Sequence, residues 1–170
     1  MTSLSKSDRP KIILSLQPLD YALEILAAFA LLALLGVAAL HYGQLPEQIP
    51  AHFGADGRPD GFGSKTAFWI LPLLGFAIYV FMTLINRRPE RFNYTVNITP
   101  ENAERQYCMA TRLIRTIKAV ALVLFAFLVW RTIGVAQGEA DGLGVWALPL
   151  VLVATLGTAF FYILKSTAQK

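Results

Sequence analysis

The sequence is poor in charge and in the residues that build most catalytic sites. Only 15% of its 170 residues are charged, and it contains two histidines and one cysteine. The single cysteine, Cys108, excludes an internal disulfide, and no C-x-x-C motif is present. The sequence also lacks a glycine-rich phosphate-binding loop and an H-E-x-x-H zinc motif. It therefore contains none of these familiar signatures of an enzyme, and we predict no catalytic residue and no cofactor.

Apolar residues, by contrast, are abundant. They make up 55% of the chain, and the mean hydropathy is +0.51. Four apolar stretches, at about 21–40, 66–85, 114–133 and 143–164, are each long enough to cross a hydrocarbon core of ~30 Å. We therefore predict an all-α membrane protein, with a lead at 1–20, a four-helix transmembrane domain at 21–165 and a tail at 166–170. The first stretch is too long for a cleaved signal peptide and contains Glu24 near its start.

The basic residues predict the orientation. Twelve of the fifteen lysines and arginines lie in the lead, in the inner connection with its adjoining helix ends, or at the C-terminus. The positive-inside rule then places both termini in the cytoplasm. The outer loops are 42–65 and 134–142, and the inner loop is 86–112. Because the membrane explains the positive charge, we do not predict nucleic acid as a partner.

The outer loop at 45–65 reads LPEQIPAHFGADGRPDGFGSK and is the most specified stretch of the chain. Four glycines lie between residues 52 and 65, a density that predicts turns and argues against an ordinary helix or strand. Asp56-Gly57 and Pro59-Asp60-Gly61 are turn sequences. We expect the loop to fold over the outer mouth of the bundle as a shaped site. The apolar residues expected to pack on the helix ends are Ile49, Phe53 and Phe62.

Polar side chains of the same loop are the candidate site. The ligand-binding or loop-organising candidates are His52, Asp56, Asp60, Ser64 and Lys65. Asp60 and Lys65 are expected to share hydrogen bonds, with His52 at their edge, and Ser64 is expected to cap the next helix. Convergence of His52, Asp56 and Asp60 on a divalent ion is a weaker alternative, which would suit a metal-dependent membrane hydrolase.

On the inner side, Phe92, Tyr94, Val96 and Ile98 alternate with polar residues, which predicts a short strand that needs a partner. Thr99-Pro100-Glu101 then predicts the start of a helix of about 34 residues, ~51 Å long, which would project into the cytoplasm. Four basic residues lie along this helix, namely Arg105, Arg112, Arg115 and Lys118. They are predicted to anchor anionic lipid or, alternatively, to dock a cytoplasmic protein partner.

Two further patterns concern the helices. Asp20 is expected to cap the first helix, and Glu24 to serve a structural role near its start, with proton or ion handling as the alternative. Pro72, expected to kink the second helix, and Pro149 lie in two similar W-x-L-P-L segments, which suggest a duplicated helix pair. A transporter or channel subunit is thus a second class of function, although no acid or base lies deep in the predicted spans.

The outer loop also resembles a known signature. Its residues match the pattern of the DUF1648 module of SdpI-like immunity proteins at Leu45, Pro46, Ile49, Pro50, His52, Phe53, Gly57, Asp60, Gly63, Ser64 and Lys65. The inner segment FNYTVNITPENAERQY is similar to the same relatives, with Thr95 in place of a proline. The resemblance implies a protein of the bacterial inner membrane, and some relatives confer immunity to a secreted toxin and signal its presence to a cytoplasmic repressor.

These observations favour a membrane protein that binds and senses a ligand. A secreted peptide or envelope ligand would bind the outer loop, and the inner face would contact a cytoplasmic partner. The lipid bilayer is its environment, and whether the protein forms a homo-oligomer stays open.

Overall fold

The structure, a computed structural model, describes residues 5–168 and contains four long helices and one two-stranded sheet. The helices are α1 (Pro18–His41), α2 (Ile70–Ile85), α3 (Ala103–Ala136) and α4 (Ala147–Ala168). The strands β1 (Gln48–Phe53) and β2 (Pro59–Ser64) form an antiparallel hairpin between α1 and α2. Short 3-10 helices lie at Tyr42–Gln44, Lys65–Trp69 and Pro89–Arg91.

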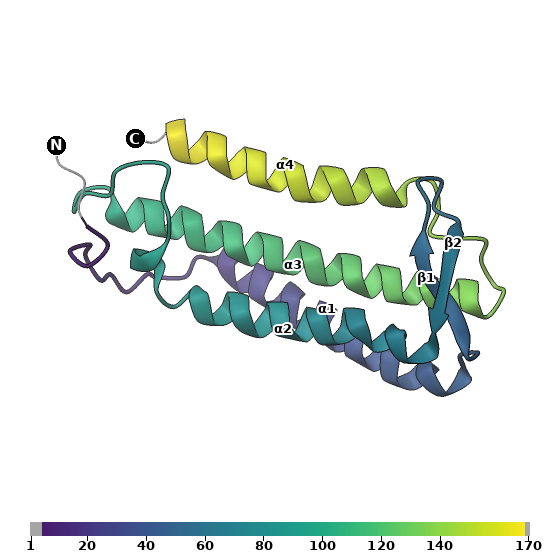
Figure 1. Ribbon diagram of the computed structural model, residues 1–170. Coiled ribbons are helices and arrows are strands. Elements are labelled where there is room, and N and C mark those ends of the chain that lie inside the picture. The colour runs from purple at the N-terminus through teal and green to yellow at the C-terminus, as the bar shows by residue number, and fades with distance from the viewer. Residues whose placement is uncertain (1–4, 169–170) are drawn as a thin grey trace.

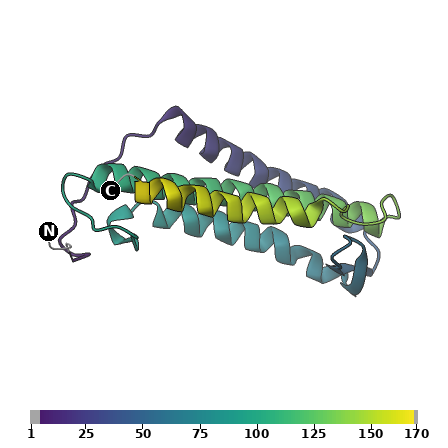
Figure 2. The same cartoon turned by 90° about the horizontal axis from the view of Figure 1, so that it is seen from above.

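The helix α3 is central to the bundle. It packs against α1, α2 and α4, with α1 and α2 on one side and α4 on the other (Figures 1 and 2). The hairpin lies at one end of the bundle, called here the hairpin end, and the start of α1 and the end of α4 lie at the opposite end, called the terminal end (Figure 1). A bundle with an even number of antiparallel helices begins and ends on the same side.

Three segments are long and apolar enough to cross a membrane. They are Pro18–Gln44, Lys65–Ile85 and Ala103–Ala136, and α4 has a shorter apolar stretch at Pro149–Tyr162. Large apolar side chains on these helices point outward, including Phe29 at 70% exposure and Val153 at 71%. Such surfaces are stable in lipid and not in water, so the protein is a membrane protein.

Small residues allow the helices to approach closely. On α1, Ala27, Ala30 and Ala38 are buried, and on α2 the buried residue Gly75 faces Leu34. A Cβ at Gly75 would lie 2.6 Å from Leu34 Cδ2, so only glycine fits there without movement of its neighbour. Close packing of small residues is the usual basis of helix association in lipid.

The prediction of an all-α protein is wrong at the outer loop, which contains the hairpin. The glycines did not prevent strands, because they make room for cross-strand neighbours. A Cβ at Gly61 would lie 3.1 Å from His52 Cβ, and one at Gly63 would lie 3.1 Å from Ala51 Cβ. The second helix also differs from expectation. Its α-helical part begins only at Ile70, after a 3-10 turn, so Pro72 lies in the first α-helical turn rather than two turns inside.

The predicted inner strand at 92–98 is also wrong, since that segment has no strand in the described structure. Its alternation is nevertheless real, because Tyr94, Val96 and Ile98 point inward and join a second small core with Ala103 and Tyr107 of α3. Apolar residues of the N-terminal lead, Ile12 and Leu14, complete this core. The lead is thus the partner of this segment, through side-chain packing rather than a backbone ladder.

Candidate functional site

The turn of the hairpin has the chemistry that its sequence predicted. Gly57 has φ +78°, a conformation that suits glycine, and its N–H donates to the Gly54 carbonyl at 2.9 Å. The Asp56 carboxylate accepts from the Arg58 N–H at 3.0 Å, and the Gly54 N–H donates to the Arg58 carbonyl at 2.8 Å. At the other end, the Lys65 N–H donates to the Glu47 carbonyl at 2.9 Å and closes the hairpin.

Apolar residues attach the hairpin to the bundle. Leu45, Ile49 and Phe68 are buried in the main core. The Tyr42 ring packs against Phe68, with ring centroids 6.3 Å apart, and the Lys65 ammonium lies 5.0 Å from the Tyr42 ring centroid. Of the three residues expected to pack on the helix ends, Ile49 does so fully and Phe53 partly, whereas Phe62 is 63% exposed.

The hairpin tip is fixed to the α3–α4 loop where Gly57 crosses Gly142 and Gly144. The Leu143 N–H donates to the Gly57 carbonyl at 2.8 Å. A Cβ at Gly57 would lie 2.8 Å from the Gly144 carbonyl oxygen, and a Cβ at Gly142 would collide with the Gly57 carbonyl. The Arg131 guanidinium donates to the Gly142 carbonyl and holds the loop from the side of α3. The loop is therefore docked, as expected of a shaped site.

A pocket of about 400 Å³ lies beneath the hairpin. Its walls come from β1, the start of α2, the hairpin end of α3 and Leu143 of the α3–α4 loop. Most lining residues are apolar, among them Phe68, Leu71 and Val129. His52 and Thr132 bring the polar side chains to the lining. An apolar cavity with a few placed polar groups is the usual form of a ligand site.

His52 and Asp60 form a pair at the edge of this pocket. His52 Nδ1 lies 2.5 Å from Asp60 Oδ1, and the two side chains are 74% and 54% exposed. Asp60 therefore orients the ring, and His52 is one of the residues that line the pocket. The expected hydrogen bond between Asp60 and Lys65 is wrong, because Lys65 turns toward Tyr42. Ser64 caps the following turn as predicted, accepting from the Thr66 N–H at 3.3 Å.

The metal alternative lacks a cluster of ligands. Among the residues that the structure describes, no three His, Cys, Asp or Glu side chains gather closely enough to hold a metal ion. Asp56 serves the turn, and His52 and Asp60 engage each other.

A second cluster, which the sequence analysis missed, joins α1 to α3 toward the terminal end. We call the five residues Asp20, Glu24, Arg112, Arg115 and Lys118 the charge ladder. Arg112 holds Asp20 through two hydrogen bonds of 2.9 and 3.0 Å, and Arg115 Nε lies 3.3 Å from Glu24 Oε1. Lys118 Nζ lies 2.6 Å from Glu24 Oε2. Acids on α1 thus match bases on α3 along successive turns.

The ladder corrects the interpretation of the basic residues on α3. Arg112, Arg115 and Lys118 turn toward α1. The side chains of Arg115 and Lys118 are too buried to form a free surface for a partner, whereas that of Arg112 stays partly exposed beside its pair with Asp20. Lys118 also donates to the Thr83 hydroxyl of α2 at 2.9 Å and lies 4.9 Å from the Tyr79 ring centroid. A titratable base is therefore buried among the spans, contrary to the expectation. Asp20 lies in the first turn of α1 and accepts from the Gln17 N–H at 2.9 Å, so it caps the helix from inside.

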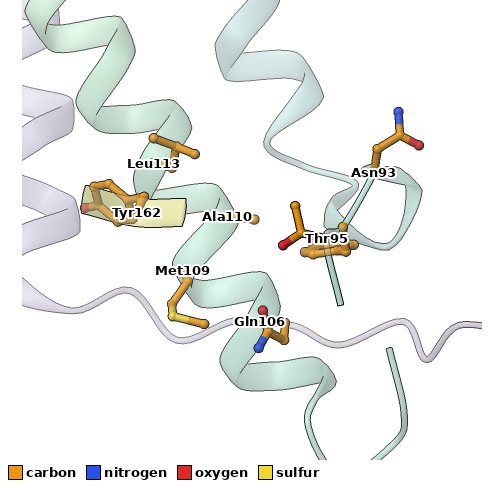
Figure 3. A pocket seen from close by; sticks show the side chains of 8 residues that line it. Asn93, Thr95, Gln106, Met109, Ala110, Leu113 and Tyr162 are labelled. Carbon is orange, nitrogen blue, oxygen red and sulfur yellow. The ribbon is translucent and has the colours of Figure 1, made fainter. Parts of the chain in front are cut away.

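The terminal end has a smaller pocket of about 110 Å³ (Figure 3). It lies between the segment 93–95, the start of α3 and Tyr162 of α4. Beside it, Arg9 donates to the Phe92 carbonyl at 2.8 Å and to the Glu90 carbonyl at 3.2 Å. Burial raises the pKa of Tyr94 above its ordinary value of 10.0, and its hydroxyl donates to the Pro89 carbonyl at 2.9 Å. The lead is therefore fastened to the inner loop.

Comparison with known proteins gives one domain match and one relative. Residues 29–76 match a domain of unknown function, DUF1648, and they include the second half of α1, the hairpin and the start of α2. The chain is also 34% identical over 145 residues to an uncharacterized protein of Archaeoglobus fulgidus, across 76% of this chain and 79% of that protein. The chain therefore contains a DUF1648 domain and is a relative of this archaeal protein. The hairpin and the pocket walls from β1 and α2 lie within the matched residues, whereas the pocket walls from α3 and Leu143, and the whole charge ladder, lie outside them. No solved structure matches the chain.

Proposed function

We propose that this DUF1648 protein is a binding and sensing protein of the cytoplasmic membrane, of the toxin-immunity type. It recognises a peptide or envelope ligand on the outer face through the hairpin and the pocket beneath it. The observation that supports this most is the 400 Å³ pocket under a hairpin that is anchored at both ends. Ordering a glycine-rich loop has a large entropic cost, and the contacts that offset it also shape the pocket.

The pocket suits a ligand with an apolar group beside a polar one. Apolar walls would take a hydrophobic side chain, and His52 at the edge would hydrogen-bond a backbone or side-chain group. The proposal puts the hairpin end outside, because the basic residues concentrate at the terminal end. In this orientation α4 is the fourth span and both termini are cytoplasmic.

A relay to a cytoplasmic partner is part of the proposal and has a physical route. The strand β1 follows α1, and α1 is tied to α3 by the charge ladder. Movement of the hairpin would therefore be transmitted to α1 and α3 together. At the terminal end, α3 carries the second core that holds the lead.

A protection assay tests the function. A host that is sensitive to secreted peptide toxins would express the protein and be challenged with these toxins, and survival would be counted. Ala67→Phe, which fills the pocket, and His52→Ala should both abolish protection. Ala77→Phe, an equal change on an exposed position of α2, is the matched control. Survival that is the same for Ala67→Phe, His52→Ala and the unchanged protein would refute the proposal.

A further inference from the structure

The charge ladder is not electrically balanced. It contains three cations, Arg112, Arg115 and Lys118, and two carboxylates, Asp20 and Glu24. Its two acids occupy the first two turns of α1, and three of its members are nearly or fully buried, with Lys118 at 0% exposure, Asp20 at 4% and Arg115 at 8%. Excess charge among membrane spans is costly unless an opposite charge lies nearby. One more anion near the ladder would therefore balance its charge.

Arg112 is the member through which an anion can reach the ladder. Its side chain is 22% exposed, whereas those of Arg115 and Lys118 are 10% and 0% exposed. Arg112 lies toward the terminal end, and it is close enough to Tyr162 of α4 for the two to interact electrostatically. An anion there would lie at the level where lipid headgroups meet the start of α1.

A crevice of about 380 Å³ begins at the same place and runs between α1 and α4. Its apolar walls include Leu19, Leu23 and Phe161, and Gly157 leaves an open space in the wall of α4. Thr116, one helical turn after Arg112 on α3, lines the crevice, and so does Tyr162, with which Arg112 interacts electrostatically, so Arg112 lies next to the crevice. The Thr116 and Tyr162 hydroxyls are 3.3 Å apart.

We propose that this crevice binds one anionic phospholipid of the leaflet at the terminal end. The acyl chain lies in the crevice between α1 and α4, and the headgroup phosphate lies beside Arg112. The crevice supplies the apolar surface and the position within the spans, and the unbalanced ladder supplies the sign of the charge. This site is independent of the proposed outer ligand, since it lies at the other end of the bundle.

Native mass spectrometry of the full chain in detergent tests this proposal. Phosphatidylglycerol and phosphatidylcholine with the same acyl chains would be added in turn, and inorganic phosphate would be added alone. We expect one tightly bound phosphatidylglycerol per chain, with binding about five-fold weaker for phosphatidylcholine, as one surface charge requires. Equal binding of the two lipids, or binding of inorganic phosphate alone as tight as that of phosphatidylglycerol, would overturn the proposal.

Two variants locate the site. A Cβ at Gly157 meets no heavy atom within 4 Å, so Gly157→Leu can place its side chain in the crevice and should abolish the one-lipid complex. Gly36→Leu is the matched control, because Gly36 also lies in a helix with open space around it. Arg112→Gln, in which Asp20 keeps Arg115 at 3.7 Å, should remove the preference for phosphatidylglycerol. If Gly157→Leu binds lipid as Gly36→Leu does, the crevice is not the site.

Discussion

Lys118 Nζ lies 2.6 Å from Glu24 Oε2, across 94 residues of sequence, and this pair joins the middle of α3 to the start of α1. The ammonium has no exposure and also bonds Thr83 of α2, so one group connects three helices. Such a pair is sensitive to the loss of Glu24, because the Lys118 ammonium would stay buried without a carboxylate.

Loss of Glu24 alone should therefore be worse than loss of both Glu24 and Lys118. We expect Glu24→Leu, which leaves the Lys118 ammonium buried without a carboxylate, to lower the free energy of unfolding by about 3–5 kcal/mol. The double variant Lys118→Met with Glu24→Leu should recover most of this loss. Denaturant unfolding in detergent measures both, with Lys65→Met, which removes only the contact to Tyr42, as a control expected to cost about 1 kcal/mol. A double variant no more stable than Glu24→Leu would contradict this account of the pair.

Gly57 should be irreplaceable for a reason beyond its backbone angle. Gly57→Ala combines a strained φ of +78° with a contact of 2.8 Å to the Gly144 carbonyl, whereas Gly138→Ala has the same φ and open space. Both should cost about 1–2 kcal/mol from the angle, and only Gly57→Ala should detach the tip. Hydrogen exchange at the Leu143 N–H, which bonds Gly57, should become much faster in Gly57→Ala alone. Equal exchange rates in the two variants would contradict the close contact between Gly57 and the α3–α4 loop.

The inner core should weaken in alkali. The raised pKa of Tyr94 means that the folded protein keeps its proton at pH values where the unfolded chain loses it. Stability is thus unaffected below pH 10.0, the ordinary pKa, and falls as the pH rises above it. Phenolate formation is followed by ultraviolet absorbance, and the difference between the unchanged protein and Tyr94→Phe gives the titration of Tyr94. Tyr94 should ionise at a higher pH than ordinary tyrosines. Ionisation of Tyr94 near pH 10.0 would contradict its burial.

Orientation is tested with reporter fusions. A reporter that is active only in the cytoplasm should give signal when fused after Lys170, and no signal when inserted next to Gly57 at the hairpin tip. The positive charge at the terminal end is the physical reason. The reverse pattern would move the pocket to the cytoplasmic face and remove the basis for an outer ligand.

The sequence predicted the helices well, because apolar length is a strong signal. The stretch expected at 21–40 lies in α1, and the expected 34-residue inner helix has that length, although it begins at Ala103 rather than at Pro100. The Asp56-Gly57 turn was also predicted from its chemistry. These features depend on local sequence, so they can be read without knowledge of contacts.

The hairpin and the ladder could not be predicted in the same way. Strand glycines such as Gly61 are explained only by the neighbour across the sheet, His52. Asp20 and Glu24 were read as helix-end residues, while their partners lie more than 90 residues away. A usable signal existed, since acids four residues apart at the start of α1 share a face and need a partner in the membrane.

The measurement that tests the central claim most directly is the reactivity of a cysteine placed at Thr132, in the pocket beneath the hairpin, in a Cys108→Ser background. A small, membrane-impermeant thiol reagent added outside intact cells should label this cysteine. Ala67→Phe, which fills the pocket, should slow the labelling strongly, and a cysteine at Ala119, buried in the core away from the pocket, should not react. Labelling unchanged by Ala67→Phe, or no labelling from outside, would contradict a pocket open to an outer ligand.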